Sequence, residues 1–281
     1  MKYALDPRPV HIVIPDTQVD PGVPTAHLNW IGRYIADKFG GRPGVKVIHL
    51  GDHWNMGSLS SYDKKGGIRM EGRRYDDDFE AGNEAFKLLS TPIEKRMARK
   101  DGWTPELHFL FGNHENRVNR AVEQDAQLDG LLSLDWMDTR GWERHDFLAP
   151  LYLDGVTYAH YFYNPMNGRA IGGMIETRLK TIGRSFTQGH QQTLMYGLRP
   201  AWTDGKPSFH HGLVAGACYL HDEDYLGPQG NTYWRGIVVC HGVEGGTYNP
   251  MFVDLDYLCR RYEGVTLEEF APGIGTGRRA A

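Results

Sequence analysis

Three short apolar runs in the first half of the chain each lead into polar side chains. They cover residues 10–15, 45–50 and 107–111, and their length and nearly continuous apolar character predict buried strands. Between the first two runs, apolar residues recur every three or four positions, which predicts a helix over residues 24–39. A strand, a helix and a second strand in this order predict a parallel sheet and an α/β fold.

The rest of the chain continues the alternation of helices and strands. A helix is expected from Asp76, interrupted at Ser90–Pro92 with Thr91 capping a second piece, and further helices are expected after Glu115, over 128–137 and over 171–182. A hairpin is expected about Asp154–Gly155, and a short strand over 184–188. Four more strands are expected in a second sheet, over 193–198, 208–215, 236–240 and 251–255.

Composition indicates a folded protein of ordinary charge. The chain has 281 residues, 40% of them hydrophobic and 23% charged, with a formal net charge of -4. This balance argues against a protein that binds duplex nucleic acid through a broadly basic surface. It does not exclude binding in a local basic groove. We expect one domain over residues 1–263, with an insertion at about 54–104, and a flexible Gly/Arg tail over 264–281.

The three cysteines are widely spaced, and no apolar run has the length of a signal peptide or a membrane span. These features predict a soluble cytoplasmic protein that is not bound to a membrane.

The residues at the ends of the three predicted strands are the candidates for a ligand site. Asp16-Thr17-Gln18 follows the first strand, Gly51-Asp52-His53 the second, and Gly112-Asn113-His114-Glu115 the third. A single Asn-His pair is most simply an ordinary turn. Three strands that each deliver a carboxylate or an amide at their carboxyl ends favour a ligand site instead, because ligands of α/β sheets bind beyond those ends.

This ordered set resembles the calcineurin-like metallophosphoesterase superfamily. Its motifs run Asp-x-His, Gly-Asp, Gly-Asn-His-Glu/Asp, an isolated His, and Gly-His-x-His. The matching stretches lie within about residues 9–200 and are Asp16–Gln18, Gly51–Asp52, Gly112–Glu115, His160 and Gly189–Gln192. The resemblance implies a β-sandwich of two mixed sheets flanked by helices, with the site at the strand carboxyl ends. The chain is similar to the compact members often encoded by phages and bacteria, some of which resemble repair exonucleases.

The resemblance also implies two divalent metal ions. Asp52 would bridge them, one metal being completed by Asn113, His160 and His190 and the other by Asp16, Gln18 and Gln192. The chain departs from the family at positions 18 and 192, where Gln replaces His. Because an amide oxygen is a harder and weaker ligand than imidazole, we expect Mn²⁺ first, with Mg²⁺, Zn²⁺ or Fe open, and weaker binding at the second site.

In the family, the His of Gly-Asn-His-Glu acts as a general acid or contacts phosphate, which assigns His114 as the catalytic residue. Glu115 or another carboxylate is expected to orient it. A basic stretch that includes Lys64, Lys65 and Arg69 is either a clamp for phosphate or a solvated loop. The predicted substrate-binding residues are His53, Arg73, Arg74 and Arg117.

The implied reaction is in-line attack on phosphorus by a metal-bound hydroxide. A phosphodiesterase, and more narrowly a nuclease acting on nucleic acid, is the first hypothesis. A phosphomonoesterase acting on nucleotides or phosphoproteins is the second, and a metal-binding protein with impaired catalysis is the third. The sequence leaves the oligomeric state and the exact substrate open.

Overall fold

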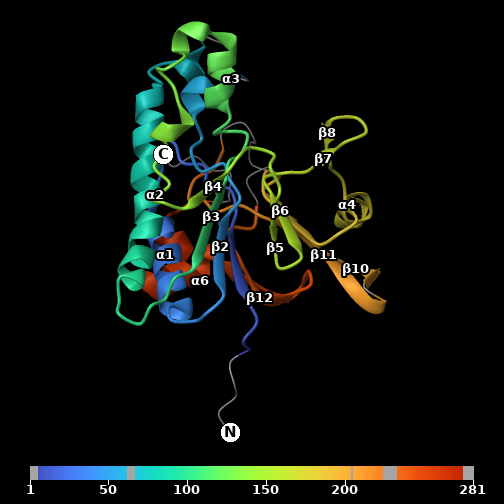
Figure 1. Ribbon diagram of the computed structural model, residues 1–281. Coiled ribbons are helices and arrows are strands. Elements are labelled where there is room, and N and C mark those ends of the chain that lie inside the picture. Colours follow the sequence, from blue (N-terminus) through green and yellow to red (C-terminus); the bar gives the residue numbers. More distant parts are fainter. Residues whose placement is uncertain (1–5, 62–66, 204, 224–232, 275–281) are drawn as a thin grey trace.

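The structure, a computed structural model, describes residues 6–61, 67–203, 205–223 and 233–274. It is an α/β fold with two mixed sheets, one of six strands and one of five, flanked by helices (Figure 1). The predicted fold class is confirmed.

The first sheet carries the three predicted strand ends. Its strand order is β13-β12-β1-β2-β3-β4, with β1 to β4 parallel and β12 antiparallel to both β1 and β13. Its strands are β1 (Val10–Ile14), β2 (Val45–His49), β3 (Glu106–Leu110), β4 (Glu143–His145), β12 (Gly236–Glu244) and β13 (Thr247–Asp254).

The placement of β12 and β13 corrects the prediction that residues 236–240 and 251–255 belong to the second sheet. The apolar run of β12 is buried on both faces: Ile237 and Val239 pack toward the helices, and Val238 and Cys240 pack toward the second sheet. A strand that is apolar on both faces suits the interior of a sheet covered on both sides, which is where β12 lies.

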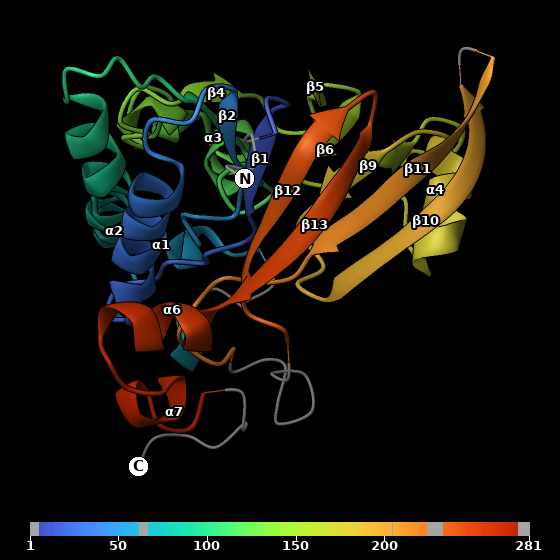
Figure 2. The ribbon, with the colours of Figure 1, turned by 90° about the horizontal axis from the view of Figure 1, so that it is seen from below.

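The second sheet has the order β10-β11-β9-β6-β5. Its strands are β5 (Leu151–Leu153), β6 (Val156–Ala159), β9 (Phe186–Gln188), β10 (Leu194–Thr203) and β11 (Lys206–Ala215), and a small separate ribbon is made of β7 (Tyr163–Asn164) and β8 (Arg169–Ala170). The predicted hairpin between β5 and β6 is confirmed, and Asp154 and Gly155 at its turn both have positive φ, as a tight hairpin turn requires. β10 and β11 extend as a long ribbon at the side away from α1 and α2 (Figures 1 and 2).

The helices α1 (Ala26–Phe39), α2 (Tyr75–Met97) and α6 (Leu255–Tyr262) lie on the other face of the first sheet (Figures 1 and 2). Shorter helices are α3 (Arg117–Gln124), α4 (Ile175–Ile182) and α7 (Leu267–Phe270). Instead of the helix predicted over 128–137, the chain forms two single turns of 3₁₀-helix, Ala126–Leu128 and Leu134–Trp136.

The predicted break in the second helix does not occur, because α2 runs without interruption through Pro92. An interior proline costs a helix about 3 kcal/mol. Burial of Leu89 and Ile93 on either side of Pro92 opposes that cost. Thr91 does not act as a cap, since its hydroxyl donates to the carbonyl of Lys87 at 2.7 Å.

The structure describes residues 264–274 of the stretch that was expected to be a flexible tail. Thr266 and Glu269 form a capping box at the start of α7, and the Phe270 ring packs edge-on against Trp30 at 5.0 Å between centroids. Residues 275–281 lie outside the described residues.

Three apolar clusters hold the described part of the chain together. One lies between the first sheet and the helices, one between the two sheets, and a smaller one between α4 and the second sheet. They leave the carboxyl ends of β1, β2 and β3 at one edge, where the ends of β6 and β9 meet them. Among the described residues, no helix combines the length and apolar character that a membrane span requires.

Candidate metal centre

Hydrogen bonds between the strand ends bring the predicted motifs together. The backbone N–H groups of Thr17 and Gln18 donate to the carbonyl of Asp52, at 3.2 and 2.9 Å. The N–H of His190 donates to Asp16 Oδ1 at 3.0 Å, which joins the second sheet to the first. The N–H of Gly189 donates to the carbonyl of His160 at 3.1 Å. The N–H of His114 donates to Asp52 Oδ1 at 2.9 Å, so five segments distant in the sequence meet at one place.

Several of these residues adopt a backbone conformation that is uncommon outside glycine. The four predicted metal ligands with positive φ are Gln18 (38°), Asp52 (51°), His190 (68°) and Gln192 (58°). Residues held in the left-handed region cost energy and concentrate at functional sites. Their occurrence at four of the predicted ligands supports a site at this edge of the sheets.

Asp52, Asn113, His160 and His190 form the first group. The Nε2 atom of His160 lies 2.9 Å from Asn113 Oδ1 and 3.3 Å from Asp52 Oδ2. The ligand atoms of Asp52, His160 and His190 all lie within 4.8 Å of one another. This set of nitrogen and oxygen donors could hold a divalent metal ion.

The hydrogen bonding of His160 fits a metal ligand. Its Nδ1 lies 2.8 Å from the carbonyl of Leu50, so Nδ1 carries a proton and donates to that oxygen. The other nitrogen, Nε2, then faces two oxygen acceptors. A proton or a metal ion at Nε2 would satisfy them. Burial alone would lower the pKa of His160, but Asp52 outweighs this and raises the pKa to about 9. A metal ion at Nε2 would take the place of that proton.

Asp52 and His190, the two titratable ligands that remain in this group, both have shifted pKa values. Burial raises the pKa of Asp52, but the neighbouring His114 and His160 outweigh it and hold the carboxyl well below its usual range. Burial, reinforced by His160, lowers the pKa of His190 to about 4. Asp52 is therefore a carboxylate and His190 a neutral imidazole, and these are the forms that bind metal ions.

Asp16, Gln18 and Gln192 form the second group. The Oδ2 atom of Asp16 and the Oε1 atom of Gln18 are buried and lack a hydrogen-bond partner. Buried oxygen atoms without a partner are costly, and a bound cation would satisfy both. Gln192 differs, because its Oε1 accepts from the Tyr219 hydroxyl at 2.8 Å. Burial, with a smaller contribution from Asp52, raises the pKa of Asp16 to about 7.

Two motif glycines are required by the close approach of these carboxylates. A Cβ atom at Gly112 would collide with Asp52 Oδ1, and a Cβ atom at Gly189 would collide with Asp16 Oδ1. The physical reason for glycine at both positions is therefore space for the carboxylates.

Glu115 supports the strand ends, so of the two predicted alternatives for orienting His114, Glu115 or another carboxylate, the structure favours the second. The Glu115 carboxylate accepts four backbone N–H groups, from Asp52 (2.9 Å), His53 (2.6 Å), Trp54 (3.0 Å) and Gly112 (2.8 Å). It thereby connects the loop after β2 to the loop after β3.

Asn55 and Asp20 orient His114, and neither residue was predicted from the sequence. The Nδ2 group of Asn55 donates to Asp20 Oδ2 at 2.5 Å, so Asn55 Oδ1 faces His114 and accepts from its Nδ1. This places the proton on Nδ1 and turns Nε2 toward Asp52 Oδ2, at 3.7 Å. Burial lowers the pKa of His114 to about 4, a shift that Asp52 opposes. The only signal in the sequence is the position of Asn55, three residues after Asp52 in the same loop.

The predicted substrate-binding residues separate into different environments. Arg117 lies at the site: one of its nitrogens donates to the carbonyl of Asn55 at 2.7 Å, and another lies 3.3 Å from His114 Nε2. His53 has no exposed surface, and its two ring nitrogens lie 2.7 Å from the Thr17 hydroxyl and 2.9 Å from the carbonyl of Gly82. This enclosed position does not fit the predicted substrate contact.

The basic stretch is described only in part. Arg73 is exposed, and its guanidinium lies over Gly57 next to Asp20, while Arg74 is exposed immediately before α2. Lys64, Lys65 and Gly66 lie outside the described residues, as does the side chain of Arg69.

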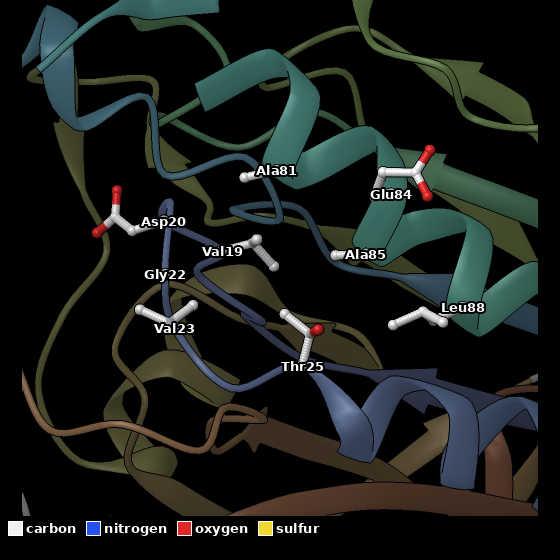
Figure 3. A pocket seen from close by; sticks show the side chains of 9 residues that line it. All are labelled: Val19, Asp20, Gly22, Val23, Thr25, Ala81, Glu84, Ala85 and Leu88. Atoms are coloured by element: carbon white, nitrogen blue, oxygen red, sulfur yellow. The ribbon is translucent and has the colours of Figure 1, made fainter. Parts of the chain in front are cut away.

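A hollow of about 270 Å³ lies beside the candidate metal centre, between the loop that follows β1 and helix α2 (Figure 3). Asp20, which binds Asn55, lines it together with Val19 and Val23, and α2 contributes Glu84 and Leu88. None of the predicted metal ligands lines this hollow, so it is a neighbour of the centre and not the centre itself.

No model of a known protein family matches the sequence, and a search of curated proteins finds no match. The fold and the site together define an α/β protein with two mixed sheets, whose buried histidine and aspartate side chains could hold metal ions.

Proposed function

We propose that the protein is a metallophosphoesterase, a metal-dependent hydrolase of phosphoester bonds. The observation that carries this proposal is the position of His160, whose Nε2 faces Asp52 and Asn113 while its Nδ1 donates to Leu50. The order of the motifs resembles the calcineurin-like superfamily, and the convergence of five strand ends at one edge supports that resemblance.

Two groups of side chains would hold the metal ions. Asp52, Asn113, His160 and His190 would bind one ion through imidazole, amide and carboxylate groups. The second ion would be bound by oxygen atoms alone, from Asp16, Gln18, Asp52 and Gln192. Bound there, divalent cations would lower the pKa of a water molecule and neutralise phosphate oxygens.

His114 and Arg117 would act on the substrate directly. With Asn55 holding the Nδ1 proton, His114 presents Nε2 on the side of Asp52. An anionic phosphate beside Nε2 favours the imidazolium form, which can then donate its proton to the leaving alkoxide. The Arg117 guanidinium lies on the same side of the ring and adds positive charge for the phosphate.

Hydrolysis of two chromogenic esters tests the proposal. We expect the purified protein with Mn²⁺ to release p-nitrophenolate from bis-p-nitrophenyl phosphate faster than from p-nitrophenyl phosphate, which would assign a phosphodiesterase. A faster reaction with the monoester would assign a phosphomonoesterase instead. The absence of turnover with Mn²⁺, Mg²⁺ and Zn²⁺ would contradict the proposed hydrolase and favour a metal-binding protein without catalysis.

A panel of DNA, RNA, cyclic nucleotides and mononucleotides, assayed with Mn²⁺, would then identify the substrate class. We expect cleavage of nucleic acid. The acidic net charge argues only against electrostatic binding over the whole surface, while Arg117 lies beside His114 and Arg73 lies next to Asp20.

A further inference from the structure

A second cluster of metal-binding side chains lies away from the candidate metal centre, on β3 and the edge strand β4. It consists of His108, Glu143 and His145, whose ligand atoms all lie within 4.8 Å of one another. His108 pairs with Glu143 in the register of the two parallel strands, and His145 follows Glu143 by two residues on the same face. None of the three residues was predicted from the sequence to have a function.

Two of the three distances between the donor atoms are close to those of a tetrahedral metal site. With metal–ligand bonds of 2.0–2.2 Å, the donors of a tetrahedral zinc ion lie about 3.3–3.6 Å apart. The Nδ1 atom of His108 lies 3.2 Å from His145 Nε2 and 3.3 Å from Glu143 Oε2. His145 Nε2 and Glu143 Oε1 lie 3.9 Å apart. Small shifts of the exposed Glu143 would bring all three donors to one ion.

The surroundings of His108 support this interpretation. Its other nitrogen, Nε2, is buried without a hydrogen bond and faces Glu106 Oε2 at 3.5 Å. Glu106 is in turn paired with Lys46 of β2 at 3.2 Å. A histidine that binds a metal through one nitrogen commonly directs the N–H of the other toward a carboxylate, which fixes the ring.

We propose that His108, Glu143 and His145 form a binding site for Zn²⁺ that is separate from the candidate metal centre. Two imidazoles and one carboxylate suit zinc better than Mg²⁺ or Ca²⁺, which prefer oxygen ligands. Water would occupy the fourth position, since Glu143 is open to solvent.

A metal ion at this site would stabilise the pairing of the edge strand β4 with the rest of the first sheet. β4 has three residues, and among the described strands it pairs with β3 alone. The Phe111 N–H donates to the carbonyl of His145 at 2.9 Å, one residue before Gly112 and two before Asn113. A metal ion between β3 and β4 would therefore stabilise the strand pair that leads to the loop of the candidate metal centre.

Zinc stoichiometry of the full chain tests this proposal. Metal-free wild-type protein, His145→Ala and Glu143→Gln would be dialysed to equilibrium against Zn²⁺, and the bound metal measured by atomic spectroscopy. We expect each variant to bind one equivalent fewer than the wild type. His210→Ala, which removes a histidine of β11 outside both groups, should bind as much zinc as the wild type.

Asp52→Asn separates this site from the proposed function. It alters the candidate metal centre alone, and adding His145→Ala to it should still remove one further equivalent. Circular dichroism in the absence of metal would establish that Glu143→Gln keeps the wild-type fold, since its carboxylate is exposed. Equal zinc stoichiometry in the wild type, His145→Ala and Glu143→Gln would overturn the proposal and leave a hydrogen-bonded histidine and glutamate cluster without metal.

Discussion

The carboxylate of Glu115 accepts the backbone N–H of Asp52 at 2.9 Å. Together with its bonds to His53, Trp54 and Gly112, this contact fixes the loop that presents Asp52. Burial, reinforced by Asp52, raises the pKa of Glu115, while the hydrogen bond from Gly112 opposes that rise. Only a carboxylate has two oxygens that can accept all four N–H groups.

Glu115→Gln should destabilise the protein and weaken metal binding. The glutamine NH₂ group would face backbone N–H donors and leave at least one of them without an acceptor. We expect a loss of about 2–4 kcal/mol in the free energy of unfolding, measured by urea denaturation. Glu123→Gln, on the exposed side of α3, is the matched control and should change stability by less than about 0.5 kcal/mol. Equal stabilities of the two variants would contradict the role of Glu115.

His114→Ala should reduce turnover without removing metal. Loss of a general acid lowers the turnover number by about 10²–10⁴-fold, and His114 is not among the proposed metal ligands. Metal content measured on the same samples should equal that of the wild type. A variant that loses metal together with activity would show that His114 is a ligand.

Asn55→Ala should reduce turnover by a smaller factor than His114→Ala, about 10-fold. His114 remains in this variant, but Asn55 Oδ1 no longer holds its tautomer. Its pH–rate profile should change in shape, which a purely structural loss would not produce. His210→Ala serves as the control for both variants, and should retain wild-type turnover.

The two groups of the candidate metal centre should bind metal with different affinities. Late first-row metal ions bind imidazole nitrogen more strongly than amide oxygen. The group with His160 and His190 should therefore bind Mn²⁺ or Zn²⁺ more tightly. Calorimetric titration of metal-free protein with Mn²⁺ should show two classes of sites, and activity should rise as the weaker class fills.

Replacing both glutamines tests the source of this asymmetry. Gln18→His combined with Gln192→His should tighten the weak class and extend activity toward Zn²⁺, whereas His190→Ala should weaken the tight class. Two equivalent sites in the wild type, or an unchanged weak class in the double variant, would refute the asymmetry.

His27 should make the folded protein sensitive to acid. Its Nε2 donates to the carbonyl of Cys218 at 2.9 Å, its Nδ1 is buried without a partner, and burial lowers its pKa to about 3. Below pH 6.5 the His27 side chain binds a proton in the unfolded chain but not in the folded chain. The free energy of unfolding therefore falls as pH decreases from 6.5 toward 3.

Each histidine of this kind adds at most about 1.4 kcal/mol per pH unit to that slope. His27→Gln should therefore flatten the stability curve below pH 6.5, measured by urea denaturation at several pH values. His210→Gln, at a partly exposed position, should flatten it less. An unchanged slope in His27→Gln would mean that His27 is already protonated in the folded state.

The strand ends that carry the candidate centre were predictable because the signal is local. Apolar runs that end in Asp16, Asp52 and Asn113 define both a strand and the polar group beyond it. Parallel pairing of β1, β2 and β3 then brings those groups to one edge. The resemblance to a known superfamily added His160 and His190, which have no comparable local signal.

Other features depend on contacts that the sequence does not specify. The role of Glu115 rests on four backbone donors from two loops, and that of Asn55 rests on the distant Asp20. The continuity of α2 through Pro92 depends on packing against the core, which local propensity does not describe. The cluster of His108 with Glu143 and His145 exists only because of the register between β3 and β4.

Asp52 is proposed to hold the metal ions for phosphoester hydrolysis. The most direct measurement compares the wild type with Asp52→Asn in the Mn²⁺-dependent release of p-nitrophenolate from bis-p-nitrophenyl phosphate. We predict that the wild-type rate rises with Mn²⁺ and saturates, and that Asp52→Asn is slower by about 10³-fold or more at saturating Mn²⁺ with its circular dichroism unchanged. Equal rates in the two proteins, or a wild-type rate that does not depend on added metal, would contradict it.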